Sequence, residues 1–61
     1  MTTYRAYRLD DRHKIKNGLW LEARSDDDAK EQAGELCEED SAAIELWQAA
    51  RLVEEIDCEP D

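Results

Sequence analysis

The sequence has little of the material from which small active sites are built. It contains one histidine, two cysteines, two glycines, one proline and no phenylalanine. It has no glycine-rich loop to cradle a phosphate and no Gly-x-Ser-x-Gly nucleophile motif. A cysteine nucleophile needs an adjacent base, but His13 lies in a polar stretch far along the chain from Cys37 and Cys58. We therefore expect no catalytic residues and no enzymatic activity.

Metal ligands are equally sparse. Zinc sites pair cysteines or histidines at short spacing, but Cys37 and Cys58 are far apart in the sequence. Cys37 instead falls in an apolar stripe, where it is expected to be a small buried side chain. The Asp-Asp-Asp run at 26–28 lacks the alternation, the glycine and the closing glutamate of a calcium loop. The sequence predicts no metal site and no cofactor.

Long hydrophobic runs are missing as well. No segment approaches the ~20 apolar residues that span a bilayer, and the first residues contain no apolar core of a signal peptide. We therefore expect a cytoplasmic protein that does not associate with membranes. In that reducing compartment, Cys37 and Cys58 are expected to be free thiols.

Basic residues are outnumbered: eight Lys and Arg stand against seventeen Asp and Glu, for a net charge of −9. Residues 1–24 hold six bases and three acids (+3), and residues 25–61 hold two bases and fourteen acids (−12). A negative field opposes binding to phosphate backbones and anionic membranes. It therefore disfavours nucleic acid as a ligand of the basic first hairpin. The candidate contacts there would be Arg5, Arg8, Arg12, Lys14 and Lys16, interleaved with Tyr4 and Tyr7.

Enough apolar residues are present to form a core. Hydrophobic residues make up 41% of the 61 residues, and a domain of this size buries ~60% of the surface that its unfolded chain exposes. We expect one domain over residues 1–61 with a frayed tail at 58–61. The core leaves no room for a deep, enclosed active site.

The first third of the chain predicts a β-hairpin. Residues 3–9 alternate with a period of two, residues 10–14 are wholly polar, and residues 15–23 resume strand character. The pair Asn17-Gly18 indicates either a bulge or part of a longer turn. In the second strand, Leu19, Leu21 and Ala23 share one face and Trp20 lies on the other.

A helix is predicted over residues 26–38. Ser25 is a preferred N-cap residue, and Asp28 three positions later completes a Ser-x-x-acid capping pattern. Three aspartates in the first turn suit the positive end of the helix dipole. Only one side of this helix can pack, because its apolar residues form a single stripe: Ala29, Ala33, Leu36 and Cys37.

Residues 42–57 are compatible with two structures. One is a helix of good helix formers, with an apolar stripe at Ala42, Leu46, Ala49, Ala50, Val53 and Ile56. The other is a hairpin that turns through residues 49–51. It would place Ile44, Leu46, Leu52 and Ile56 on one face and Trp47 beside Val53 on the other. Propensity slightly favours the helix, because two alanines are poor residues for a tight turn. Both ββαββ and ββαα therefore remain open.

A resemblance favours the hairpin. It is carried by Tyr4-Arg5-x-Tyr7-x-Leu9-Asp10, then Trp20-Leu21-Glu22-Ala23 with Ser25-Asp26-Asp27-Asp28-Ala29, then Glu45-Leu46-Trp47-Gln48 with Arg51-Leu52-Val53. In this order the chain resembles a family of small uncharacterised cytoplasmic proteins, mostly from alphaproteobacteria, that run ββαββ over their whole length. Those proteins commonly have a glycine where this chain has Ala49. The resemblance implies an α+β fold, an antiparallel sheet with one helix on one face, and no function.

An excess of apolar residues gives the main functional hypothesis. One helix covers only one face of a four-stranded sheet, and the covered face can be supplied by Leu19, Leu21, Ala23, Ile44, Leu46, Leu52 and Ile56. Trp20, Trp47, Val53 and one tyrosine, for which we take Tyr7 over Tyr4, would then lie on the opposite face with arginines. That composition is typical of protein-binding hot spots. We therefore expect a non-enzymatic module that binds a protein partner or forms a homodimer through the uncovered face.

The alternative hypothesis uses the acidic half of the chain. An acidic inhibitor or nucleic-acid mimic would occupy a basic groove through carboxylates on the helix and just beyond it. The candidates are Asp27, Asp28, Glu31, Glu35, Glu38 and Glu39.

Overall fold

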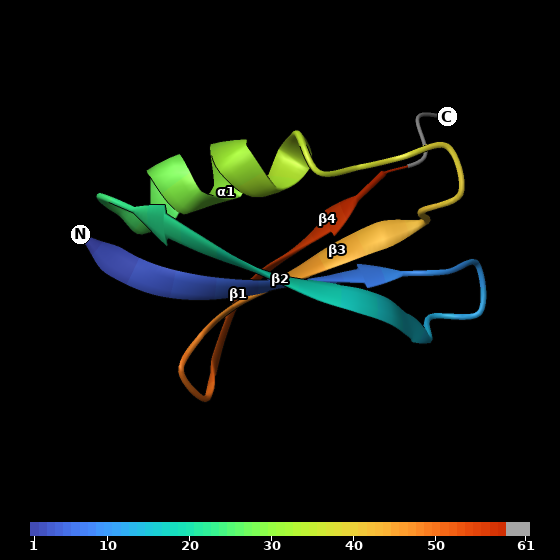
Figure 1. Ribbon diagram of the computed structural model, residues 1–61, viewed down its shortest axis with the longest axis horizontal. Coiled ribbons are helices and arrows are strands. Elements are labelled where there is room, and N and C mark those ends of the chain that lie inside the picture. The colour runs from blue at the N-terminus through green and yellow to red at the C-terminus, as the bar shows by residue number, and fades with distance from the viewer. Residues whose placement is uncertain (59–61) are drawn as a thin grey trace.

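A computed structural model of the chain describes residues 1–58 and has the element order ββαββ (Figure 1). The elements are β1 (Thr2–Leu9), β2 (Ile15–Ala23), α1 (Asp26–Gly34), β3 (Ala43–Gln48) and β4 (Arg51–Asp57). The predicted α+β class is therefore confirmed. Residues 42–57 contain a hairpin rather than a helix, so the ββαα alternative is wrong.

The four strands form one antiparallel sheet in the order β2-β1-β3-β4. The strands β1 and β3 are central, and the edges are β2 and β4. Figure 1 shows the sheet strongly twisted, with α1 lying across its upper side. The lower side has no second layer over it within residues 1–58.

Local capping starts the helix where the sequence predicts. The Ser25 hydroxyl accepts a hydrogen bond from the Asp28 backbone N–H at 3.2 Å, and the Asp28 carboxylate accepts one from the Arg24 N–H at 3.0 Å. Two backbone donors that the helix itself leaves unpaired near its start are thereby satisfied.

A polar clamp then ties the first turn of α1 to the sheet. The Tyr4 hydroxyl donates to Asp26 Oδ1 at 2.7 Å, and the Arg51 guanidinium contacts both carboxylate oxygens at 3.2 Å. Arg51 and then Tyr4, by hydrogen bonding the charged form, hold the pKa of Asp26 below its ordinary value. The same Asp26 bond raises the pKa of Tyr4. The clamp therefore joins β1, α1 and β4 through one carboxylate.

The helix ends four residues earlier than predicted, at Gly34. Two tighter bonds close it, from Glu35 N–H to Gln32 O at 3.1 Å and from Leu36 N–H to Ala33 O at 3.0 Å. Residues 36 and 37 therefore lie beyond the helix, although Leu36 and Cys37 still pack against the core as their place in the stripe predicts.

Small side chains dominate the core between α1 and the sheet. Ala29 and Ala33 of the helix are fully buried against Ala6 and Ala23 of the strands. Larger side chains complete the cluster: Tyr4, Ile44 and Leu46, with Leu21, Val53 and Ile56 partly buried beside it. Alanines on both surfaces leave little bulk between the helix and the sheet.

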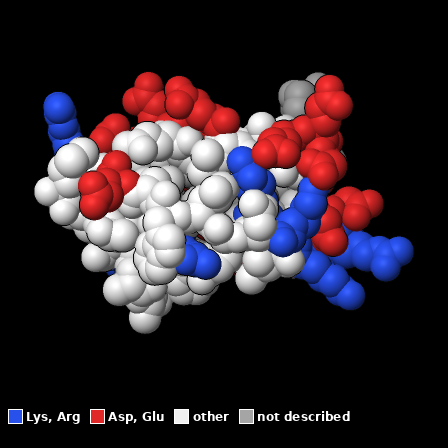
Figure 2. Space-filling view, viewed as in Figure 1, with Lys and Arg blue, Asp and Glu red and all other residues white. Residues whose placement is uncertain are grey.

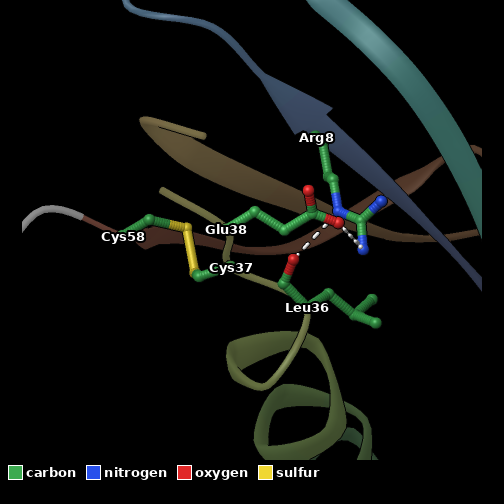
Figure 3. Close-up of a disulfide and its surroundings, with 5 residues drawn as sticks. All are labelled: Arg8, Leu36, Cys37, Glu38 and Cys58. Atoms are coloured by element: carbon green, nitrogen blue, oxygen red, sulfur yellow. Dashed lines mark hydrogen bonds and ion pairs between the residues drawn. A yellow bond between two sulfur atoms is a disulfide. The ribbon is translucent and has the colours of Figure 1, made fainter. Parts of the chain in front are cut away.

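A covalent link, rather than free thiols, fastens the segment after the helix. Cys37 and Cys58 form a disulfide with a Cα–Cα distance of 5.6 Å (Figure 3). The same figure shows Arg8 reaching this segment, where its Nε donates to Leu36 O at 2.9 Å and its Nη2 pairs with Glu38 at 2.9 Å. The prediction of two free thiols is wrong, because the fold brings together two cysteines that are distant in the sequence.

Cys58 also corrects the expected tail. Its backbone N–H bonds to Ala42 O at 2.9 Å, and its sulfur is in the disulfide. Cys58 is therefore held in place, and the rest of the segment predicted to fray, 59–61, lies outside the described residues.

A β-bulge in β4 reverses which faces of the sheet Leu52 and Val53 occupy. Leu46 pairs with Glu54 and Trp47 with Leu52, so Val53 is the additional residue in the register. Val53 consequently packs against the core, and Leu52, 47% exposed, pairs with Trp47. Strict alternation with an unbroken register had predicted the reverse, with Leu52 on the covered face and Val53 beside Trp47.

The β3–β4 turn has two residues, Ala49 and Ala50, between the paired Gln48 and Arg51, instead of the three predicted. Ala49 has φ 56°. A positive φ at the first central position alone is what a type II′ turn requires, and glycine usually occupies it. The backbone here thus adopts a glycine conformation with an alanine.

We expect Ala49→Gly to stabilise the domain by about 1 kcal/mol, because glycine avoids the steric cost of the left-handed region. Urea denaturation measures the change. Ala50→Gly is the matched control, since Ala50 has no positive φ; there the flexible glycine should destabilise by about 0.5–1 kcal/mol. Equal effects at the two positions would contradict the assigned turn.

Replacing both cysteines by alanine should lower the free energy of unfolding by about 3 kcal/mol, because the disulfide spans 21 residues of chain and restricts the unfolded state. Urea denaturation of the oxidised protein and the double variant gives the difference. Dithiothreitol should reproduce the loss in the wild type and leave the double variant unchanged. Equal midpoints for the oxidised protein and the variant would refute the stabilising role.

Candidate interaction surface

The side of the sheet away from α1 carries a shallow hollow of about 430 Å³. We call it the aromatic hollow; its lining is Thr3, Arg5, Tyr7, Ile15, Trp20, Glu45, Trp47, Ala49 and Ala50. The residues come from β1, β2, β3 and the β3–β4 turn. Strand alternation accounts for their shared face: Thr3, Arg5 and Tyr7 are two residues apart on β1, while Tyr4 and Ala6 between them point into the core.

Arg5 lies at the centre of the aromatic hollow. In the sheet register it stands between Trp20 of β2 and Trp47 of β3. Its Cζ is 4.3 Å from the centroid of the Trp20 ring and 5.4 Å from that of Tyr7. At these distances a guanidinium is attracted to the ring faces by cation–π interaction. The aromatic side chains therefore hold Arg5 against the sheet.

Gly18 makes room for this arrangement. Tyr7 pairs with Gly18 on the neighbouring strand, and a Cβ on Gly18 would lie 2.7 Å from Arg5 Nη2 and 2.9 Å from its Nε. The guanidinium thus occupies the space that a side chain at position 18 would take. Arg5 Nε is buried there and has no hydrogen-bond partner within residues 1–58.

Trp47 is positioned from its own strand. Its indole Nε1 donates to Glu45 Oε1 at 3.3 Å, which orients the ring and engages a carboxylate that lines the hollow. Trp47 is half-buried, whereas Trp20 is 69% exposed. The two tryptophans therefore differ in exposure: Trp47 is packed against its neighbours, and the Trp20 ring is mostly open to solvent.

Three of the four residues proposed from the sequence for this surface meet in the structure: Tyr7, Trp20 and Trp47 line one hollow. Val53 does not, because the bulge in β4 turns it to the core. Sequence reasoning missed Arg5 as the central residue. Its place two residues before Tyr7 on a strand was a usable signal, but its stacking depends on Gly18 of a different strand.

The six carboxylates of the alternative hypothesis do not form one helical face. Glu38 and Glu39 lie beyond the end of α1, and Glu38 is paired with Arg8. Asp28 caps the helix and also accepts a bond from Gln32. The other three, Asp27, Glu31 and Glu35, are exposed. Figure 2 shows acidic side chains along the helix and at the end of the molecule near the end of β4.

The bases of the first hairpin are divided between different contacts. Arg8 is bound to the segment after the helix, and Lys16 pairs with Asp40. Arg5 lies in the aromatic hollow. These residues therefore do not form one continuous basic surface.

Two further observations describe the chemistry of residues 1–58. They contain no group of three or more His, Cys, Asp or Glu side chains arranged to hold a metal ion. The one helix, α1, is also too short and too polar to cross a membrane.

Comparison with known proteins does not assign this chain to a family. A scan against protein-family models and searches among curated proteins and solved structures found no match. Function must therefore be inferred from the side chains themselves.

We expect Gly18→Ala to displace the Arg5 guanidinium from Trp20 without unfolding the domain. The atoms that the new Cβ would meet are at the end of a flexible side chain, and Gly18 has no positive φ. Stability should stay within about 1 kcal/mol of the parent protein, while the emission of Trp20 changes in a Trp47→Phe background.

Gly34→Ala is the matched control, because nothing beyond its chain neighbours and the helix backbone lies within 4 Å of the Cβ it would gain. It should raise stability by about 0.5–1 kcal/mol through helix propensity and leave the Trp20 emission as it is. An unchanged Trp20 emission in the Gly18 variant would show that the guanidinium does not depend on that space.

Proposed function

We propose that this protein is a non-enzymatic interaction module that binds a partner protein, or a second copy of itself, through the aromatic hollow on the uncovered face of the sheet. The observation that carries the proposal is the exposure of Trp20. An indole that is 69% exposed stands beside Tyr7, Trp47 and a central arginine. Tryptophan, tyrosine and arginine are the residues most enriched at binding hot spots.

The form of the hollow supports binding rather than catalysis. It is open and shallow, and among its lining residues the only acid is Glu45, with no histidine or cysteine. Glu45 is engaged by Trp47. The side chains on offer can stack on apolar groups and donate hydrogen bonds, which is what a binding surface needs.

The uncovered face is also a better candidate than the acidic helix. Asp28 and Glu38 already serve the fold. In Figure 2, which shares the orientation of Figure 1, the lower left below the sheet is largely uncharged. A surface with few charges and several aromatic side chains can be desolvated on binding at lower cost than a row of carboxylates.

We also propose that the protein is cytoplasmic and that it is related to the small alphaproteobacterial ββαββ proteins. The sequence order around Trp20 and Trp47 supports the kinship. A cytoplasmic location carries a requirement, because cytosolic thiols are kept reduced. The domain must then stay folded without the Cys37–Cys58 disulfide, and the stability of the double cysteine variant decides whether it can.

Trp20→Ala tests the proposal. Sedimentation equilibrium measures self-association, and affinity capture from a lysate of the organism that encodes the chain measures a different partner. We expect the wild-type protein either to self-associate or to capture a partner. Truncation of Trp20 should weaken that association by about thirtyfold, since a central aromatic anchor contributes ~2 kcal/mol.

Glu31→Ala, an exposed position on the far side of α1, is the control and should leave association intact. Circular dichroism and urea denaturation should show both variants folded, because neither side chain belongs to the core. A monomer whose captured proteins are the same with and without the Trp20 indole would refute the proposal.

A further inference from the structure

Arg5 is an unusual cation for this chain. The protein has nine more negative than positive charges, and its other partly buried arginine, Arg8, is paired with a carboxylate. The exposed Arg51 is paired as well. Arg5 is half-buried, yet within residues 1–58 its guanidinium makes no ion pair or hydrogen bond. Its contacts are with the rings of Trp20 and Tyr7.

An unpaired guanidinium has a chemical consequence. The Nε–H of Arg5 is buried without an acceptor within residues 1–58, which is costly, and cation–π contact returns only part of that cost. The guanidinium is also pre-ordered, because Gly18 provides its space and the rings hold its plane. A ligand carboxylate could therefore bind it without first ordering a flexible side chain or breaking an existing ion pair.

Nearby carboxylates restrict what kind of anion fits. Glu45 lines the hollow and is bonded to Trp47. Glu22 is two residues from Trp20 on the same strand and pairs with Thr3 of the hollow. These acids border the one cation and repel a polyanion such as nucleic acid. A single carboxylate carried on an apolar group suits the site better.

The size of the face indicates a segment of chain rather than a whole globular surface. The longest extent of the molecule is 31 Å, and four strands span about 14 Å across. The footprint of the strand backbones is therefore about 400 Å², which is small beside the ~800 Å² of accessible surface that each partner contributes to a standard interface. So small a footprint suits a peptide segment better than a second copy docked face to face.

We infer that the aromatic hollow binds a peptide segment of a partner protein that places a carboxylate on the Arg5 guanidinium and an adjacent large apolar side chain beside Trp20. This inference rests on the proposed function and deepens it by naming the chemistry of the partner. Arg5 supplies charge and donors, while the tryptophans, Tyr7 and Ile15 supply the apolar contact.

The test selects ligands from a displayed library of random peptides on the immobilised full chain. Enriched peptides should carry Asp, Glu or a free C-terminal carboxylate next to Trp, Phe, Leu or Ile. A synthetic peptide of the enriched sequence is then compared with its Asn or Gln isostere by calorimetry. We expect the neutral isostere to bind at least about tenfold more weakly, as the loss of a charge-assisted hydrogen bond implies.

Variants test whether the affinity for the acidic peptide depends on Arg5. Arg5→Gln and Gly18→Ala should each weaken the acidic peptide about tenfold or more, and Arg5→Lys should recover only part of the affinity because lysine cannot form a bidentate pair. Arg12→Gln removes the same charge from the exposed β1–β2 loop and should have little effect. If Arg12→Gln lowered the affinity for the acidic peptide as much as Arg5→Gln does, the peptide would be held by the overall charge rather than by Arg5, and the inference would be overturned.

The outcomes separate this inference from the proposed function. Peptides that need Trp20 but neither an acid nor Arg5 would overturn the carboxylate assignment and leave the binding surface standing. Selection of no peptide that depends on Trp20 would overturn the inference, while association of whole proteins through Trp20 would still uphold the proposed function. Selective binding of single-stranded nucleic acid to the hollow would overturn the inference as well.

Discussion

A nine-residue helix can cover only one side of a four-stranded sheet, and the rest of this structure follows from that limit. The main core cluster consists of residues of α1 and of the side of the sheet that α1 covers. The other side must remain stable in water or meet a partner. Its side chains are amphipathic for that reason: the aromatic rings bring apolar surface, and a stacked arginine keeps charge at the centre.

So small a core needs additional fastening. Alanines at the helix–sheet contact allow close packing but bury little apolar area per residue. Polar and covalent links compensate at both ends of α1. Asp26 joins the start of the helix to Tyr4 and Arg51, and the disulfide with Arg8 holds the segment that follows its end.

Much of the fold, and part of the candidate surface, could be predicted from the sequence. The Ser25 cap, the polar stretch after Leu9 and the alternation around Trp20 are local signals, and they predicted the helix start, the first hairpin and the orientation of the tryptophan correctly. Errors arose where contacts distant in the sequence intervene. The bulge opposite Leu46 and the stacking of Arg5 over Gly18 each depend on a neighbouring strand.

The sequence by itself determined the first hairpin and the start of the helix and placed Trp20 on the face away from Leu19 and Leu21, while the second hairpin was favoured only with the help of a resemblance. These properties depend on periodicity and capping, which act within a few residues. Only the tertiary structure decided that the cysteines bond, that Val53 rather than Leu52 is inside, and that no carboxylate of residues 1–58 pairs with Arg5. Each of those depends on which atoms different strands and the segment after the helix bring within a few ångströms of each other, and such distances are not written in any one segment of the chain.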